Sequence, residues 1–151
     1  MKTAFDLLSQ TRENILKILE AHKGKEYIIP KGFNNNLYWN VAHCVVTQQL
    51  LCYKLSNNDI IIDNELVELY KKGTKPKADA PNIIEVGKVK DLLVTAVEQM
   101  EKDYQAGLFK NYNQYETSYG VTLNSIDDAI LFNNSHEALH LGYMLAMSKH
   151  L

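Results

Sequence analysis

The sequence predicts an all-α protein, a bundle of four long helices with one short extra helix. Four long segments place apolar side chains at helical spacing, and no segment shows a convincing strand pattern. Clusters of glycine, proline and asparagine separate these segments. A helix with an apolar stripe buries that stripe against its neighbours, which favours a bundle. With 151 residues, the chain can bury about two-thirds of its unfolded surface in one core, so we expect a single domain over residues 1–151.

Composition and charge narrow the classes of function. A net charge of -2 and scattered lysines argue against a nucleic-acid-binding surface. No apolar run reaches the ~18–20 residues that a membrane span needs, and Asp6 places an acid too early for a secretory signal. Cys44 and Cys52 are separated by about 12 Å along one helical run, which is too far for a mutual disulfide. We therefore expect reduced thiols, a cytoplasmic location, and neither nucleic-acid nor membrane partners.

The first helix is expected over residues 3–22. Its apolar positions recur at helical spacing with charged residues between them. Gly24 and Pro30 follow and end the helical pattern. The apolar stripe includes Phe5, Leu8, Ile15 and Leu19.

The second helix is expected to begin at an asparagine N-cap within residues 34–36 and to continue to about Leu55. It carries two apolar stripes, and a helix that is apolar on both faces is buried on both. One face should meet the bundle core, and the other a further helix or a second subunit. We expect a homodimer through this helix; the alternative is that the rest of the chain covers both faces. The stripes are Leu37, Val41, Cys44, Val45, Leu51, Cys52 and Leu55, and Trp39, His43, Val46, Leu50 and Tyr53.

The middle of the chain is expected to hold a short helix, a loop and the third long helix. Asp63 can cap a short helix through Tyr70, and the polar, proline-bearing residues 71–81 read as a loop. Residues 82–105 then form the third long helix, which Gly107 ends. The apolar stripe of that helix is Val86, Val89, Leu93, Val97, Met100 and Tyr104.

Residues 108–123 are expected to form a long irregular crossover before the last helix. Two interpretations of Tyr112, Tyr115 and Tyr119 stay open, because these tyrosines can line the mouth of a cavity or pack over the ends of the bundle. Asn124 or Ser125 caps the last helix. Its inward stripe is predicted to be Ile126, Ala129, Asn133, His136, His140, Tyr143, Met144 and Met147.

Two histidines of the last helix indicate a metal site. His136 and His140 are four residues apart, so both imidazoles lie on one helical face, close enough to hold one ion. Their buried ring nitrogens need partners. A tight divalent site needs a third protein ligand, and His43 is the natural candidate because it lies mid-helix on an apolar stripe. His22 and His150 stand at helix ends and read as surface residues.

Three other chemistries fit the pattern less well. The run His136 to His140 spells His-Glu-x-x-His, but a metallopeptidase needs a further downstream ligand, and Glu137 turns about 100° from His136, toward the edge of the stripe. A di-iron bundle needs a second Glu-x-x-His, which is missing. Cys44 follows His43 directly, and adjacent positions on a helix diverge, which argues against a thiol–imidazole pair.

Two motifs carry a resemblance to a known family. The first is Trp39-Asn40-Val41-Ala42-His43, and the second is His136-Glu137-Ala138-Leu139-His140-Leu141-Gly142. With these motifs in order, the chain resembles the DinB-like superfamily of metal-binding four-helix bundles, which includes damage-inducible DinB proteins and bacterial thiol S-transferases. The resemblance implies an up-down-down-up bundle, commonly dimeric, with His43, His136 and His140 as the metal ligands. Leu141 stands where the family often has an arginine.

The predicted function follows from this ligand set. Three neutral imidazoles leave a divalent metal with open positions, as in catalytic sites, and they suit Zn, Ni or Fe. We expect a metal-dependent transferase that acts on small molecules, with a low-molecular-weight thiol as the candidate cosubstrate. The alternatives are a non-enzymatic metal-binding stress-response protein and a metal-dependent hydrolase. Trp39, Tyr143 and Met144 share or neighbour the ligand stripes, so each is a candidate pocket wall or a core-packing residue.

Overall fold

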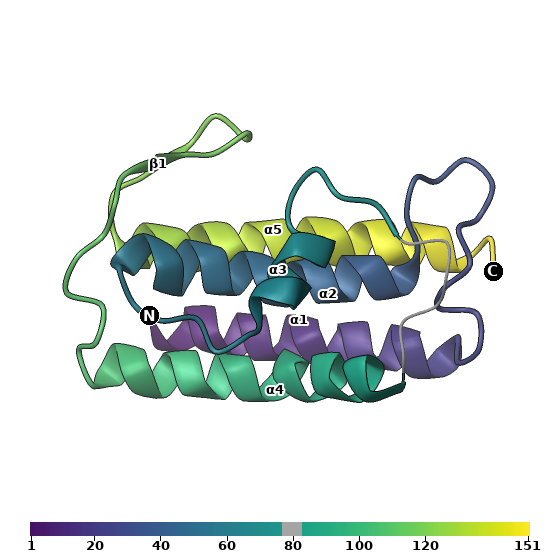
Figure 1. The fold of residues 1–151 in the computed structure, drawn as a ribbon, viewed down its shortest axis with the longest axis horizontal. Coiled ribbons are helices and arrows are strands. Elements are labelled where there is room, and N and C mark those ends of the chain that lie inside the picture. The colour runs from purple at the N-terminus through teal and green to yellow at the C-terminus, as the bar shows by residue number, and fades with distance from the viewer. Residues whose placement is uncertain (77–82) are drawn as a thin grey trace.

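The computed structural model describes residues 1–76 and 83–151, and within them the chain is mostly helical (Figure 1). The predicted all-α class is confirmed at this level. The helices are α1 (Lys2–Ala21), α2 (Leu37–Gln48), η1 (Gln49–Tyr53), η2 (Lys54–Ser56), α3 (Asn64–Tyr70), α4 (Ile83–Gln105) and α5 (Ile126–Ser148), and the strands are β1 (Tyr115–Glu116) and β2 (Thr122–Leu123). None of the helices in the described residues is long and apolar enough to cross a membrane.

The four long helices lie side by side (Figure 1). Helix α1 contacts α4 and α5, and α2 contacts the same two helices. Buried side chains from all four fill the space between them. The predicted stripes of α1 and α4 are buried at Phe5, Leu8, Ile15 and Leu19 and at Val89, Leu93, Val97 and Met100. The predicted up-down-down-up order stays a prediction.

Several predicted helix ends coincide with the observed ones. The side chain of Asn36 accepts a hydrogen bond from the Trp39 backbone N–H at 2.8 Å and caps α2, and Ser125 caps α5 by accepting from the Asp128 N–H at 3.1 Å. Asp63 is the N-cap residue of α3, and Gly107 follows α4 with a φ of 71°. The predicted loop 71–81 is described to residue 76; its remainder and Asn82, the predicted start of the third helix, lie outside the described residues.

The second helix differs from its predicted form near its end. Regular α-helix stops at Gln48, and the chain continues through the π-turn η1 and the 3₁₀ turn η2 to Ser56. A π-turn inserts one extra residue into the helical register, so it rotates the side chains that follow it. Gln49 makes a long-range contact at this point, because its side-chain oxygen accepts a hydrogen bond from the Ile61 N–H at 3.0 Å.

The rest of the chain covers both faces of α2. All ten residues from Leu37 to Val46 are buried within a single chain. The apolar surface that suggested a homodimer through this helix is therefore already satisfied, and the reason for placing an interface here does not hold. The dimer itself stays a prediction. Apolar side chains that remain exposed include Leu131, Leu139 and Leu145 of α5.

The crossover before α5 contains a small hairpin that the sequence interpretation missed. Strands β1 and β2 are antiparallel, with Tyr115 opposite Leu123. Gly120, with a φ of 82°, supplies the turn, and the Thr117 hydroxyl donates to the Val121 carbonyl at 2.8 Å. Two-residue strands are too short to produce a recognisable alternation in the sequence, which explains the omission.

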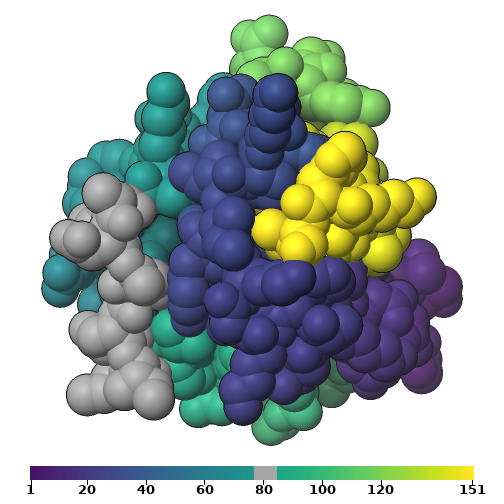
Figure 2. Space-filling view, turned by 90° about the vertical axis from the view of Figure 1, so that its right-hand side faces the viewer, coloured from purple at the N-terminus to yellow at the C-terminus, as the bar shows by residue number. Residues whose placement is uncertain are grey.

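One end of the bundle is closed by the connection between α1 and α2. Figure 2 looks at this end, where the connection lies beside the last residues of α5. Phe33 packs against Tyr143 and His150, with ring centroids 5.3 and 5.5 Å apart. Tyr143, predicted to point into the core, is instead 36% exposed.

A buried ion pair that was not predicted lies between the helices of the bundle. Glu137 was predicted at the edge of the α5 stripe, but it is fully buried and forms two hydrogen bonds with Arg12, at 2.7 and 2.9 Å. Arg12 also donates to the Leu93 carbonyl of α4 at 3.2 Å and to Gln48 of α2 at 3.2 Å. Asn133 donates to Glu137 at 2.9 Å. The Arg12–Glu137 pair thus connects α1, α2, α4 and α5. Because Glu137 points into the core, the inward face of α5 is rotated toward Glu137 relative to the predicted stripe.

Candidate metal centre

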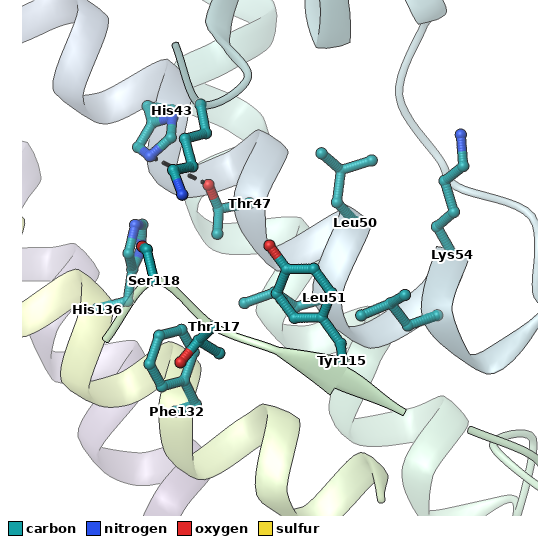
Figure 3. Close-up of a pocket in the computed structure, with 12 residues that line it drawn as sticks. His43, Thr47, Leu50, Leu51, Lys54, Tyr115, Thr117, Ser118, Phe132 and His136 are labelled. Atoms are coloured by element: carbon teal, nitrogen blue, oxygen red, sulfur yellow. Dashed lines mark hydrogen bonds between the residues drawn. The ribbon is translucent and has the colours of Figure 1, made fainter. Parts of the chain in front are cut away.

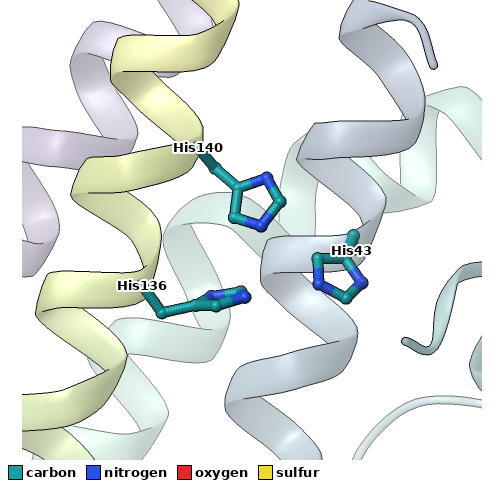
Figure 4. A group of neighbouring side chains, drawn as sticks. All are labelled: His43, His136 and His140. Atoms are coloured by element: carbon teal, nitrogen blue, oxygen red, sulfur yellow. The ribbon is translucent and has the colours of Figure 1, made fainter. Parts of the chain in front are cut away.

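The three predicted histidines meet where α2 packs against α5. His43 comes from α2, and His136 and His140 come from successive turns of α5 (Figure 4). One nitrogen atom from each ring lies within 4.8 Å of the others. The ring centroids are 5.2, 4.9 and 4.5 Å apart for the three pairs. We call these residues the histidine triad.

The donor set of the triad fits a divalent transition metal. A zinc ion lies about 2.0–2.1 Å from each imidazole nitrogen, which places two such nitrogens about 3.4 Å apart in a tetrahedral site. Small side-chain rotations bring nitrogens within 4.8 Å to that separation. The triad could therefore hold one divalent metal ion, and imidazole ligands do not distinguish Zn from Ni or Fe.

Hydrogen bonds orient two of the rings. Nδ1 of His43 lies 2.6 Å from the Tyr70 carbonyl oxygen, and Nδ1 of His140 lies 2.8 Å from Oδ1 of Asn40. Both partners are acceptors, because the Asn40 amide group donates to the Asn36 carbonyl at 2.7 Å. Each Nδ1 therefore carries the proton, and the lone pair is on Nε2. Nε2 of His43 accepts a 3.3 Å hydrogen bond from the Thr47 hydroxyl, which a metal ion would replace.

Asn40 is a supporting residue to which the sequence analysis gave no role. It comes three residues before His43, within the first motif, and it is a fully buried amide in a mostly apolar helix. A buried polar side chain of this kind needs partners, and this need was the available signal. Partners that hold the second nitrogen of a ligand histidine fix its tautomer and its orientation.

One ring nitrogen of His136 lacks a hydrogen-bond partner. Its Nδ1 atom is buried and has no hydrogen-bond partner among the described residues. A cation bound at Nδ1 would satisfy this atom, and the unpartnered nitrogen is in this way compatible with a metal on the ring. Trp39 supports the neighbouring ring, because its indole stacks on His43 with centroids 4.7 Å apart and planes 9° apart.

The environment keeps all three imidazoles neutral at pH 7. Burial, together with the charges that His140 and His43 would carry, lowers the pKa of His136 to about 3. Burial and His43 lower the pKa of His140 to about 4. Burial also lowers the pKa of His43, although the Tyr70 carbonyl opposes that shift. Neutral imidazoles have free lone pairs, as metal ligation requires.

These lowered pKa values predict a pH-dependent stability of the metal-free protein. In the unfolded chain a histidine protonates near pH 6.5, whereas the folded His136 and His140 resist protonation down to about pH 3–4. The free energy of unfolding should therefore fall as the pH drops below 6.5, by up to about 1.4 kcal/mol per pH unit and per histidine. Urea unfolding between pH 7 and pH 5 measures this. A variant with His136→Ala and His140→Ala should lose most of the slope, and an equal slope in both proteins would contradict the assignment.

A cavity of about 400 Å³ lies beside the triad (Figure 3). His43 and His136 form part of its wall, and the hairpin contributes Tyr115, Thr117 and Ser118. Tyr115 therefore borders a cavity, while Tyr112 donates its hydroxyl to the Leu51 carbonyl at 3.1 Å. The other lining residues are Thr47, Leu50, Leu51, Lys54, Leu55, Lys72 and Phe132.

The three candidate pocket walls lie outside this lining. Met144 is fully buried in the apolar core. Tyr143 packs on Phe33 near the end of the bundle. Trp39 lies against His43, and its indole N–H donates to the Thr74 hydroxyl at 3.2 Å. Trp39 is thus a neighbour of the triad without being a wall of the cavity.

A comparison with known protein families identifies the family to which this chain belongs. The DinB superfamily matches residues 7–144, a span that contains both motifs and all three histidines. This chain belongs to the DinB superfamily. The superfamily is generally metal-binding, in agreement with the triad. The comparison with curated proteins found no match.

The position of Glu137 argues against a peptidase in this DinB-superfamily protein. Its carboxylate is fully buried and paired with Arg12, so it is not presented beside the triad as a general base. The two thiols are equally unsuited to catalysis. Burial raises the pKa of Cys44 well above its usual value and the pKa of Cys52 to about 12, so both stay protonated. Leu141 is partly buried and packs against the core.

Proposed function

We propose that this DinB-superfamily protein binds one divalent transition metal ion through His43, His136 and His140, and that it transfers groups between small molecules. We further propose a low-molecular-weight thiol as the cosubstrate. One observation carries the proposal: three neutral imidazoles converge, and two of them line a cavity large enough for a small molecule. Small-molecule sites have volumes of about 300–1,000 Å³ and are mostly apolar with a few polar groups.

The number of ligands supports a catalytic metal rather than a structural one. Structural zinc sites are closed by four protein ligands, whereas catalytic sites have three and keep one position open. Among the described residues, the triad is the one group of histidine, cysteine and acidic side chains placed to share an ion. Two of its members line the cavity, so an open coordination position would be accessible to a molecule bound there.

The metal ion and the residues of the protein would contribute different parts of the proposed transfer. A divalent cation would lower the pKa of a thiol that binds to it. The thiol would give up its proton to solvent, its sulfur would form a bond to the electrophilic atom of the substrate, and the leaving group would depart with the bonding electrons. Tyr70 and Asn40 hold the rings of His43 and His140 in place throughout. The wall of the cavity is mostly apolar, which would disfavour water as a competitor of the thiol.

Cobalt substitution tests the thiol step. Protein loaded with one equivalent of Co²⁺ should develop a sulfur-to-cobalt absorption band when N-acetylcysteine is added, because thiolate binds the open position. N-acetylserine, which lacks the sulfur, is the matched control and should give no band. A protein that retains Co²⁺ but shows no band with any small thiol would contradict the thiol cosubstrate.

The two alternative functions, a metal-dependent hydrolase and a non-enzymatic metal-binding protein, predict different outcomes for the same metal-loaded protein. A hydrolase should cleave an activated ester with metal and lose this activity on chelation, without any requirement for thiol. A non-enzymatic metal-binding protein should lose stability by several kcal/mol when the ion is removed, since binding of a structural ion is coupled to folding. Removal of a catalytic ion should leave the bundle folded, because the apolar clusters between the helices consist of residues other than the triad.

A further inference from the structure

The outward face of α5 is uncharged over almost the whole length of the helix. Between residues 129 and 148 the sequence has one acidic or strongly basic residue, Glu137, and it is buried in the core. By contrast, α1 exposes Glu13 and Lys17 to solvent, and α4 exposes Asp91. A helix that borders solvent normally carries charged residues on its outer side, and one that is apolar all round is covered by other surfaces. The outward face of α5 therefore has the composition of a contact surface.

The residues of this outward face are arranged symmetrically along the helix. We call them the α5 face: Asp128, Leu131, Ser135, Ala138, Leu139, Gly142, Ala146 and Lys149. All are exposed except Asp128, which is half-buried, and Leu131 and Leu139 are 55% and 58% exposed. The spacings of three, four, three, one, three, four and three residues read the same from either end. Their centre lies between Ala138 and Leu139.

A second copy of the same helix, running antiparallel, matches this symmetry. In a two-fold dimer, residue i of one copy contacts residue j of the other, and the reverse contact is identical. With the axis between Ala138 and Leu139, each leucine of the face would lie opposite a small residue. A Cβ atom added at Gly142 would meet nothing within 4 Å in its own chain, so a partner helix can approach closely there. The facing pairs would be Leu131 with Ala146, Leu139 with Ala138, and Ser135 with Gly142.

The charges at the two ends of the face favour the antiparallel direction. Asp128 lies in the first turn of α5, and Lys149 follows its last turn. An antiparallel pair would bring Lys149 of one copy opposite Asp128 of the other, twice in the dimer. A parallel pair would instead bring Asp128 opposite Asp128 and Lys149 opposite Lys149, and like charges across an interface repel each other. Charge complementarity therefore distinguishes the two directions.

A groove lies where the partner helix would end. It has a volume of about 280 Å³ and runs between the hairpin and the start of α5. Asp128, Leu131 and Ser135 of the α5 face line it. The hairpin contributes Tyr119 and Val121, which are both exposed. In the antiparallel pair these three α5 residues face the last two turns of the partner helix, so the groove would receive that end of the partner.

The surface is large enough for a stable dimer. With 23 residues, α5 is about 34 Å long at 1.5 Å per residue. A strip of this length and about 20 Å wide, which includes the hairpin beside the helix, has an area of about 700 Å². A dimer would then bury about 1,400 Å² in total, within the range of about 1,200–2,000 Å² that stable protein interfaces bury.

We propose that two copies of this chain associate through the α5 face, with the two α5 helices antiparallel and the two-fold axis between Ala138 and Leu139. His136 and His140 are directed toward His43 of α2 and do not belong to this face (Figure 4). The contact therefore involves none of the triad residues and requires no metal. The proposed dimer and the proposed metal-dependent transfer can each fail without the other.

Analytical ultracentrifugation of the metal-free protein tests the interface. At micromolar concentration the wild-type chain should sediment with twice the chain mass of 17.3 kDa. A variant with Leu131→Glu and Leu139→Glu places uncompensated charges in the contact, so the dimer should weaken at least a hundredfold and the mass should fall to that of one chain.

The control variant changes an exposed apolar residue elsewhere. Val94 is 42% exposed on α4, outside the α5 face, so Val94→Glu should leave the dimer intact. Circular dichroism checks that every variant keeps the helical content of the wild type. A wild-type chain that is monomeric throughout, a double leucine variant that stays dimeric, or a Val94→Glu variant that dissociates equally would each overturn the proposal.

A pair of charge variants tests the direction of the two helices. Ser135→Glu alone and Gly142→Lys alone each place an unpaired charge in the contact and should weaken the dimer at least tenfold. The two positions are about 10 Å apart along their own helix, too far to pair within one chain. In the antiparallel dimer each new carboxylate lies opposite a new ammonium group, so the double variant should recover an affinity within about threefold of the wild type. A double variant as weak as the single ones would overturn the antiparallel arrangement.

Discussion

Protein that carries His136→Ala and His140→Ala is expected to contain almost no divalent metal, whereas the wild-type chain should contain about one ion. Two of the three ligands are lost in this variant, and a single imidazole does not hold a divalent ion against dilution. The measurement is elemental analysis by mass spectrometry on protein purified without a histidine tag. Because His136 and His140 do not belong to the two apolar clusters of the core, the variant should stay helical.

The matched control uses the two histidines outside the triad. His22 ends α1, where its Nδ1 lies 2.9 Å from the Ile18 carbonyl, and His150 packs on Phe33. A variant with His22→Ala and His150→Ala should keep the full metal content. Metal content that is the same in both double variants and in the wild type would show that the ion, if present, binds elsewhere.

Replacing Arg12 with methionine is expected to lower the free energy of unfolding by about 3–5 kcal/mol. The substitution preserves most of the apolar volume, but it leaves the Glu137 carboxylate buried without its cation. An uncompensated buried charge is among the largest single destabilising effects known in proteins. Urea unfolding followed by circular dichroism measures the change. A loss below about 1 kcal/mol would mean that the pair contributes as weakly as a surface ion pair.

Two companion variants separate charge from packing. The second substitution in an Arg12→Met, Glu137→Leu double variant removes the stranded carboxylate, so at least half of the lost stability should return. Lys90→Met breaks the more exposed pair with Glu20 and should cost about 1 kcal/mol or less. If the double variant is as unstable as Arg12→Met alone, the loss comes from packing around Arg12 rather than from the buried charge of Glu137.

The Arg12–Glu137 pair and the histidine triad depend on the same orientation of α5. Glu137 follows His136 directly and precedes His140 by three residues on α5. When its carboxylate faces Arg12 in the core, the helical rotation of about 100° per residue directs the neighbouring histidines toward α2 and His43. The glutamate of the His-Glu-x-x-His run therefore sets the orientation of α5 and has no place in a peptidase mechanism.

Local residues were sufficient to predict the helices and most of their ends. The caps at Asn36 and Ser125 and the glycine after α4 act through backbone groups within a few residues of themselves, so their effect is visible in a short window. The same holds for the i, i+4 pair His136 and His140. His43 was the candidate third ligand because of its position on an apolar stripe, and the family resemblance strengthened this choice. Spacing along the chain alone does not indicate which helices will pack together.

The all-α class, the apolar stripes of α1 and α4 and the candidate triad His43, His136 and His140 followed from the sequence and its family resemblance. The tertiary structure alone decided that α2 is covered by its own chain, that η1 and the hairpin border a cavity, and that Glu137 pairs with Arg12 across 125 positions. Each of these features depends on contacts between distant segments. Their energy comes from burial and charge pairing that exist only once the helices have packed, so no local pattern encodes them.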